Sequence, residues 1–238
     1  MERLNNRNIL IAGATGGIGR HLATLLVQSG ARVFLAARNQ TTLEALGAEL
    51  KLPSQQLFSF DVTDENSIIR MGDAIHAEIS CIDILINASG IGIIKPVEQL
   101  SLSEFQQSLQ VNLTGSFLLV KTFLPAMKKA GKGLIINIPG VLGKVSMAGA
   151  AAYCASKYGL VGMMQSIREE LKRTEIRITN IYLGGVDSPF WDNIELRVQK
   201  DRMIRAEEAA RAIWFLCQQP VSGVVSEMVL QPFNHQAI

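Results

Sequence analysis

Short apolar runs alternate with longer amphipathic segments along most of the chain. Seven of the apolar runs predict β-strands, at residues 9–12, 32–36, 57–60, 84–86, 134–138, 177–182 and 228–230. Six longer segments predict helices, at residues 18–29, 40–51, 65–79, 103–129, 150–174 and 206–218. Strands that are apolar on both faces are typical of a parallel sheet covered by helices. The pattern therefore predicts an α/β fold, with a three-layer, doubly wound parallel sheet of about seven strands.

Residues at the ends of the helical segments support these boundaries. Asp64 and either Ser101 or Ser103 are of the types that cap helix N-termini, and Gly30 and Gly131 are of the type that ends helices. No Pro- or Ser-rich linker, internal repeat or low-complexity tract divides the sequence. We therefore expect a single domain over residues 1–238.

Composition and charge exclude several classes of protein. The 238 residues carry 23 Lys and Arg against 21 Asp and Glu, a formal net charge of +2, and 48% of them are hydrophobic. This mixture is too apolar for intrinsic disorder and too evenly charged for a protein that coats nucleic acid. The 3 Cys and 3 His show no ligand spacing, so we expect no metal site and no disulfide framework. The polar N-terminus lacks a cleavable apolar segment, and no stretch approaches the roughly 18 apolar residues of a membrane span. We expect a cytoplasmic protein without nucleic-acid or membrane partners.

A glycine-rich turn follows the first predicted strand. Residues 13–19 read Gly-Ala-Thr-Gly-Gly-Ile-Gly and precede a predicted helix. Glycines permit a tight turn, and the helix N-terminus offers free N–H groups and a positive dipole end to a pyrophosphate. The order strand, turn, helix is that of a dinucleotide-binding βαβ unit, although such turns also serve merely to reverse the chain. The residues expected to contact the dinucleotide are Gly13, Thr15, Gly16, Gly17, Ile18 and Gly19.

The end of the second predicted strand indicates which dinucleotide is bound. An acidic residue here would accept hydrogen bonds from a ribose 2′-OH, but the chain has Arg38 after Ala37. A guanidinium pairs well with a 2′-phosphate, so NADP(H) is favoured over NAD(H). The alternative is an ordinary solvated arginine. Gly16 adds no second positive charge within the turn, so we expect the preference to be moderate.

Tyr153 and Lys157 are four residues apart at the start of the predicted helix 150–174, and therefore on one face of it. The nearby ammonium is expected to favour the phenolate and to lower the pKa of Tyr153. Tyr153 would then donate a proton to a carbonyl oxygen or accept one from an alcohol. The spacing alone also fits a surface helix with a solvated lysine.

Three further motifs occur in order at fitting separations: Asp61-Val62, Asn87-Ala88-Ser89-Gly90 and Asn112-Leu113-Thr114-Gly115. With the glycine turn and the Tyr-x-x-x-Lys pair, they make the chain resemble the short-chain dehydrogenase/reductase family, in its compact single-domain branch, over essentially its whole length. The resemblance implies a Rossmann-type fold, and a homodimer or homotetramer with contacts from residues 103–129 and 150–174.

The resemblance also implies roles for individual residues. Asn112 would hold a water that links Lys157 to bulk solvent, and Lys157 would hydrogen-bond the nicotinamide ribose. Tyr153, Lys157 and Asn112 form the expected catalytic set. Further cofactor contacts would come from Asp61, Val62, Asn87, Gly90, Val186 and Ser188.

One position departs from the family pattern. The family usually places a serine thirteen residues before the tyrosine, to donate a hydrogen bond to the substrate oxygen, but this chain has Gly140. Losing such a donor can cost about 10² to 10³ in turnover. Three explanations are open: the substrate or a water supplies the missing group, Ser146 moves in from the following loop, or turnover is inefficient. If only the donor is missing, Gly140→Ser should accelerate reduction of simple carbonyl compounds.

The leading hypothesis is an NADP(H)-dependent carbonyl reductase or dehydrogenase that acts on a small or medium carbonyl or alcohol substrate. The alternative is a catalytically weak or inactive NADP(H)-binding sensor or assembly subunit, as Gly140 suggests. A sugar-nucleotide epimerase is disfavoured because little chain follows the sixth strand.

Residues 188–203, with Phe190 and Trp191, predict a short substrate lid, unless these aromatic residues pack on the helices beneath. The tail, residues 231–238, is placed to reach a neighbouring subunit.

Overall fold

The computed structural model describes residues 2–194, 196–220, 222–234 and 236–237. One sheet contains the strands β1 (Asn8–Ala12), β2 (Arg32–Ala37), β3 (Leu57–Ser59), β4 (Ile84–Asn87), β5 (Lys132–Asn137), β6 (Glu175–Leu183) and β9 (Glu227–Leu230). A separate short pair consists of β7 (Val186–Asp187) and β8 (Ile204–Arg205). The α-helices are α1 (Gly17–Gln28), α2 (Gln40–Glu49), α3 (Glu65–Glu78), α4 (Leu102–Leu109), α5 (Gly115–Ala130), α6 (Ala151–Leu171) and α7 (Ala206–Leu216).

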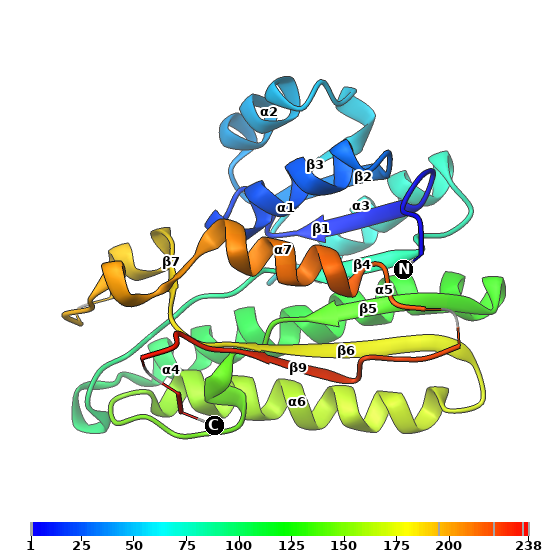
Figure 1. Ribbon diagram of the computed structural model, residues 1–238. Helices are drawn as coiled ribbons and strands as arrows, with labels where there is room; N and C mark the ends of the chain where they lie inside the picture. Colours follow the sequence, from blue (N-terminus) through cyan, green and yellow to red (C-terminus); the bar gives the residue numbers. More distant parts are fainter. Residues whose placement is uncertain (1, 195, 221, 235, 238) are drawn as a thin grey trace.

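The main sheet has seven parallel strands in the order β3-β2-β1-β4-β5-β6-β9 (Figure 1). The strand order reverses between β1 and β4, where the chain leaves one half of the sheet for the other. In open α/β sheets of this kind, ligands bind beyond the carboxyl ends of the strands at such a reversal. The predicted doubly wound parallel sheet is confirmed.

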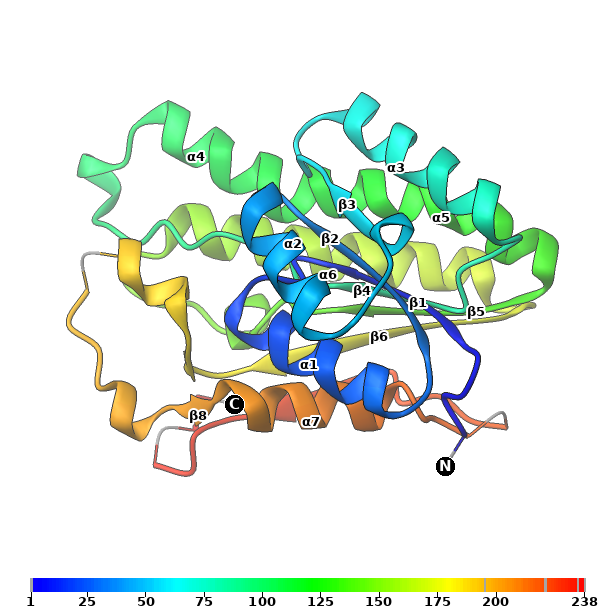
Figure 2. The ribbon, with the colours of Figure 1, turned by 90° about the horizontal axis from the view of Figure 1, so that it is seen from above.

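Helices cover both faces of the sheet, as Figure 2 shows from above. Along β1, Ile9 and Ile11 contribute to the core beneath α1 and α7, whereas Leu10 and Ala12 contribute to the core beneath α3, α5 and α6. All four side chains are fully buried. This alternation is what a strand covered on both faces requires, and it accounts for the continuous apolar runs of the sequence.

The predicted helix signals can be compared with the ends of the helices. Asp64 accepts a hydrogen bond from the Asn66 backbone N–H at 2.9 Å. Ser101, rather than Ser103, caps α4, in a reciprocal arrangement with Glu104. Gly131 ends α5 with a φ of 73°. Within the described part of the chain, no helix is both long and apolar enough to cross a membrane.

The single helix predicted over residues 103–129 is interrupted. A π-helical turn, η3 (Gln110–Thr114), separates α4 from α5, and Asn112 lies within it. The Ser116 hydroxyl donates to the Asn112 backbone carbonyl at 2.7 Å, so a side chain takes part in bonding at the altered turn. Such π-turns are frequent at functional sites, and this one fixes where the Asn112 side chain points.

Candidate active site

A cavity of about 920 Å³ lies beyond the carboxyl ends of the strands. It is lined by the glycine turn, by the loops that follow β4, β5 and β6, by the first turns of α6, by parts of residues 188–203 and by the C-terminal tail. Among the described residues that line it, Lys157, Arg197 and Arg202 carry positive charge and none has an acidic side chain. The cavity therefore suits an anionic ligand.

The glycine turn forms one wall of this cavity. Gly13 has a φ of 86°, and a Cβ atom there would lie only 2.7 Å from the Ala88 backbone, so the loop after β4 can approach only because residue 13 is glycine. A Cβ atom at Gly17 would lie 2.8 Å from the Ser188 Cβ atom, which places the start of the lid above the turn. Of the turn residues predicted to contact a dinucleotide, Thr15 alone does not line the cavity.

Arg38 and Asp61 lie outside the cavity wall, beyond β2 and β3. The Asp61 carboxylate accepts hydrogen bonds from the Thr63 backbone N–H at 2.8 Å and from its hydroxyl at 2.7 Å. These bonds hold the pKa of Asp61 below its usual range, and the charge of Arg38 adds to the effect. Val62 is buried in the core, against Gly115. Arg38 is exposed, and no salt bridge joins it to another described residue.

The Asn87 side chain holds the loop after β4 from beneath. Asn87 is buried, donates to the Ser116 hydroxyl at 2.7 Å and accepts from the Ser89 backbone N–H at 3.2 Å. Its neighbour Gly90 lines the cavity, and a Cβ atom there would lie 3.1 Å from Asn112 Oδ1. Asn87 thus acts on the cavity through the loop and does not itself line it.

Asn112 joins this loop to the helix that carries the tyrosine. It accepts from the Ile91 backbone N–H at 2.9 Å and donates to the Ile91 carbonyl at 3.0 Å. It also donates to the Ser156 hydroxyl at 3.0 Å, and Ser156 in turn donates to the Tyr153 carbonyl at 2.7 Å. Asn112 is 1% exposed, so these partners satisfy a side chain that water cannot reach.

Three serines of this network were not predicted from the sequence: Ser108, Ser116 and Ser156. Ser108, Asn112 and Ser116 are spaced by four residues, which puts small polar side chains on one face of a helix that is otherwise apolar on its buried side. This four-residue spacing could have been used to predict a buried polar network from the sequence.

Tyr153 and Lys157 face the cavity together. The Lys157 ammonium lies 5.4 Å from the centre of the Tyr153 ring and donates to the Ile138 carbonyl at 3.1 Å. Lys157 is 4% exposed, and burial lowers its pKa to about 8. Burial also raises the pKa of Tyr153, so the predicted lowering was wrong for this structure. The physical reason is that loss of solvent around the phenol outweighs the attraction of an ammonium held by a carbonyl.

Gly140 has φ 69° and ψ 172°, a conformation available essentially to glycine alone. A Cβ atom there would lie 3.3 Å from the Leu183 carbonyl oxygen. The backbone conformation at this position therefore favours glycine, independently of the missing hydroxyl. Ser146 lines the same cavity but is exposed, and no hydrogen bond joins it to Tyr153.

The predicted lid lies over the tyrosine. The Phe190 ring packs 5.9 Å from the Tyr153 ring, and Trp191 contacts Phe190 edge-on at 5.3 Å. The Trp191 indole N–H donates to the Val186 carbonyl at 2.8 Å, which ties the lid to β7. Both aromatic residues line the cavity, as do Val186 and Ser188. Residue 195 of the lid lies outside the described residues.

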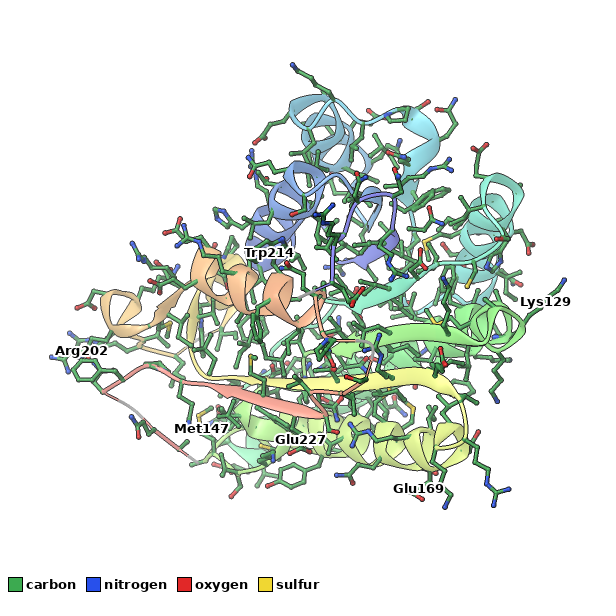
Figure 3. All side chains as sticks on the ribbon, turned by 45° about the vertical axis from the view of Figure 1, so that its right-hand side comes forward. Lys129, Met147, Glu169, Arg202, Trp214 and Glu227 are labelled. Atoms are coloured by element: carbon green, nitrogen blue, oxygen red, sulfur yellow. The ribbon has the colours of Figure 1, made fainter. Side chains whose placement is uncertain are left out.

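The C-terminal tail turns back over the cavity of its own chain. Gln231, Pro232, Asn234 and Ala237 line it, on the side where Met147 and Arg202 appear in Figure 3. Residues 235 and 238 lie outside the described residues. Among the described residues, no group of three His, Cys, Asp or Glu side chains is placed to hold a metal ion.

The model of the short chain dehydrogenase family matches residues 7–199. The chain belongs to this family. The predicted family and the α/β fold are therefore confirmed, and the protein is an oxidoreductase of the short-chain dehydrogenase type.

Two relatives and one solved structure indicate how similar this short-chain dehydrogenase is to known proteins. It is 32% identical to D-threitol dehydrogenase of Mycolicibacterium smegmatis, over 93% of this chain and 90% of that one. It is 30% identical to cyclopentanol dehydrogenase of a Comamonas species, over 97% of each chain. The structure of a metagenomic short-chain oxidoreductase in complex with NADP superposes with a TM-score of 0.83 at 29% identity, covering 97% of this chain and 99% of the other.

Proposed function

We propose that this short-chain dehydrogenase uses NADP(H) to transfer a hydride between the nicotinamide and a small or medium carbonyl or alcohol substrate, with Tyr153 as general acid and base. The observation that carries the proposal is that Tyr153 and Lys157 face the same cavity as the glycine turn. A proton donor and a dinucleotide cradle within one cavity are the two parts that carbonyl reduction needs.

The residues present fit the cofactor. A Cβ atom at Gly13 would collide with the Ala88 backbone and one at Gly17 with Ser188, so the turn can lie this close to its neighbouring loops only with glycine at both positions. The helix α1 begins there, at Gly17, with backbone N–H groups free to bind a pyrophosphate. Gly90, Val186 and Ser188 line the cavity and would contact the nicotinamide half; Asn87 would hold the loop that carries Gly90. Bound NADP(H) would supply the hydride. Relatives whose structures contain NADP or NADPH support the assignment.

Arg38 supports NADP(H) over NAD(H). It follows β2, is exposed and has no salt bridge among the described residues, so its guanidinium is available for a 2′-phosphate. Asp61, whose charge interacts with Arg38, and Val62 would lie at the adenine. The Asp61 carboxylate offsets part of the positive charge that Arg38 would present to a 2′-phosphate. This supports only a moderate preference for NADP(H) over NAD(H).

Tyr153 would act as the proton donor in the direction of reduction. Because burial raises its pKa, its hydroxyl carries the proton at neutral pH. A charged Lys157 stabilises negative charge that develops on the hydroxyl as the proton leaves. Asn112 joins α6 to the loop after β4 by hydrogen bonds, which fixes the position of Tyr153 relative to Gly90.

Gly140 offers no side-chain donor to the substrate oxygen. The missing hydrogen bond would have to come from a water or from a polar group of the substrate, and loss of one such donor lowers turnover by about 10² to 10³. Simple carbonyl compounds should therefore be slow substrates. The lid, residues 188–203, with Phe190 over Tyr153, would limit the size of the carbonyl compound. We also propose a homodimer or homotetramer with contacts from α4, α5 and α6.

The experiment measures NADPH oxidation with a panel of aldehydes, ketones and sugar-derived carbonyl compounds. Tyr153→Phe is the control variant, because it keeps the ring packed against Phe190 and removes only the hydroxyl. We expect its turnover to fall at least about 10²-fold while its affinity for NADPH changes less than about twofold. Equal turnover in the two proteins would refute the role of Tyr153. Tight NADPH binding without turnover of any compound would favour a sensor or assembly subunit.

A further inference from the structure

Glu227, labelled in Figure 3, begins β9. It contacts two side chains from other parts of the chain. One carboxylate oxygen contacts the Lys144 ammonium at 2.5 Å, and the other accepts a hydrogen bond from the Tyr182 hydroxyl at 3.0 Å. The Lys144 ammonium also lies 4.4 Å from the centre of the Tyr182 ring. Each of the three side chains therefore contacts the other two.

This cluster lies beside three segments that line the cavity: the loop after β5, the end of β6, and the tail that follows β9. Lys144 lies in the loop after β5, whose residues Val141, Leu142, Val145 and Met147 line the cavity. Tyr182 lies in β6 and precedes Leu183, the last residue of that strand, and Gly184 of the loop that follows, both of which line the cavity. Glu227 begins the strand that leads into the tail. None of the three clustered side chains lines the cavity itself.

The cluster is more constrained than an ordinary surface ion pair. Tyr182 is fully buried, so its ring and hydroxyl occupy one position and orient both partners. Burial raises the pKa of Tyr182 to about 12, so the hydroxyl stays a donor, and Lys144 holds the pKa of Glu227 below its usual range. Arg168 is the other charged group that faces the cluster; its guanidinium donates to the Ile178 and Ser226 carbonyls.

We propose that Lys144, Tyr182 and Glu227 are positioning residues, which hold the loop after β5 and the C-terminal tail in the arrangement that binds the carbonyl substrate. The inference rests on the proposed function, because it assigns these walls to the substrate. Of the proposed cofactor contacts, Val186 and Ser188 follow β6 a few residues beyond Tyr182 and the others come from segments outside the cluster, so we expect the cluster to act chiefly on substrate binding.

The test compares Lys144→Met and Glu227→Gln with a matched pair at the other end of the sheet. Arg32, at the start of β2, contacts Glu78 at 3.2 Å and lies 5.3 Å from the centre of the Phe34 ring, so it forms the same kind of cluster away from the cavity. Arg32→Met and Glu78→Gln remove that cluster in the same way.

We expect Lys144→Met and Glu227→Gln to raise the KM for the carbonyl substrate roughly tenfold, with the KM for NADPH unchanged within about twofold. Lys144→Arg, which keeps the charge and can stack on Tyr182, should restore the KM to within about threefold of the parent. Arg32→Met and Glu78→Gln should change neither KM. Carbonyl KM values that are equal in the two sets of variants would overturn the proposal.

Hydrogen exchange gives a readout that does not depend on a substrate. The backbone N–H groups of Gly143, Lys144 and Val145 are hydrogen-bonded within the loop, so they should exchange at least about fivefold faster in Lys144→Met, and no faster in Arg32→Met. If Lys144→Met does not fold, Tyr182→Phe takes its place, because it removes only the hydroxyl. It should show a smaller rise in the KM for the carbonyl substrate and a smaller increase in the exchange rate of the same N–H groups. If the parent reduces no carbonyl compound, the proposed function fails while this exchange still tests the cluster. An unchanged exchange rate in a folded Lys144→Met or Tyr182→Phe protein would overturn the proposal that the cluster holds this loop.

Discussion

Substituting Gly140 tests whether its backbone, rather than the lack of a hydroxyl, determines which residue is tolerated there. A residue with a Cβ atom at φ 69° and ψ 172° carries a conformational cost of about 1–3 kcal/mol. The contact of that Cβ atom with the Leu183 carbonyl oxygen at 3.3 Å adds mild crowding. We therefore expect Gly140→Ala to lower the free energy of unfolding by about 2 kcal/mol.

The assay is urea denaturation followed by circular dichroism. With a denaturant dependence of about 2 kcal/mol per molar urea, the loss corresponds to a midpoint lower by roughly 1 M. Gly162→Ala is the control, because Gly162 lies within α6 with no atom within 4 Å of an added Cβ atom. Alanine should stabilise that helix by up to about 1 kcal/mol. The two substitutions thus have opposite expected signs.

The rate of carbonyl reduction by Gly140→Ser tests the same reasoning about the backbone at residue 140. If the backbone determines residue 140, then Gly140→Ser places its hydroxyl on a strained chain, and the reduction of simple carbonyl compounds should not accelerate. A folded Gly140→Ser protein that is as stable as the parent and reduces such compounds faster would refute this reasoning. It would restore the simpler view that only a hydrogen-bond donor is missing.

Three further results are expected. Arg38→Gln should raise the KM for NADPH roughly tenfold or more and leave that for NADH within about twofold, in steady-state kinetics with each cofactor. The kcat/KM for reduction should fall as the pH rises through about 8, where Lys157 loses its proton while Tyr153 keeps its own; in Lys157→Arg, whose guanidinium stays charged, this fall should disappear from the pH profile. Ser116→Ala should lower the free energy of unfolding by about 1–3 kcal/mol, because it removes the partner of the buried Asn87 amide, whereas the exposed Ser103→Ala should be neutral in the same urea titration.

Much of the fold was predictable because local patterns of apolar, capping and glycine residues encode it. Apolar runs located the seven strands of the main sheet to within a few residues, and capping residues located helix ends such as that at Asp64. The glycine turn and the four-residue spacing of Tyr153 and Lys157 were also readable, since a turn and one helical turn are set by neighbours in the chain. These features need no knowledge of what packs against them.

Other features depended on segments far apart in the sequence. The direction of the Tyr153 pKa follows from burial by the surrounding segments, and the ammonium spacing alone pointed the other way. The π-turn at Asn112 and the left-handed backbone at Gly140 arise where a helix or loop must meet its neighbours in space. The contacts of Glu227 join residues 45 and 83 positions away.

The sequence by itself determined the class of sheet and predicted the dinucleotide turn and the proton donor, because each is encoded by periodicity or by residues a few positions apart. Only the tertiary structure decided the direction of the Tyr153 pKa shift, the backbone conformation at Gly140 and the contacts that join Lys144, Tyr182 and Glu227. Desolvation and long-range contacts exist only once the chain has folded, and they govern the energies of single buried groups.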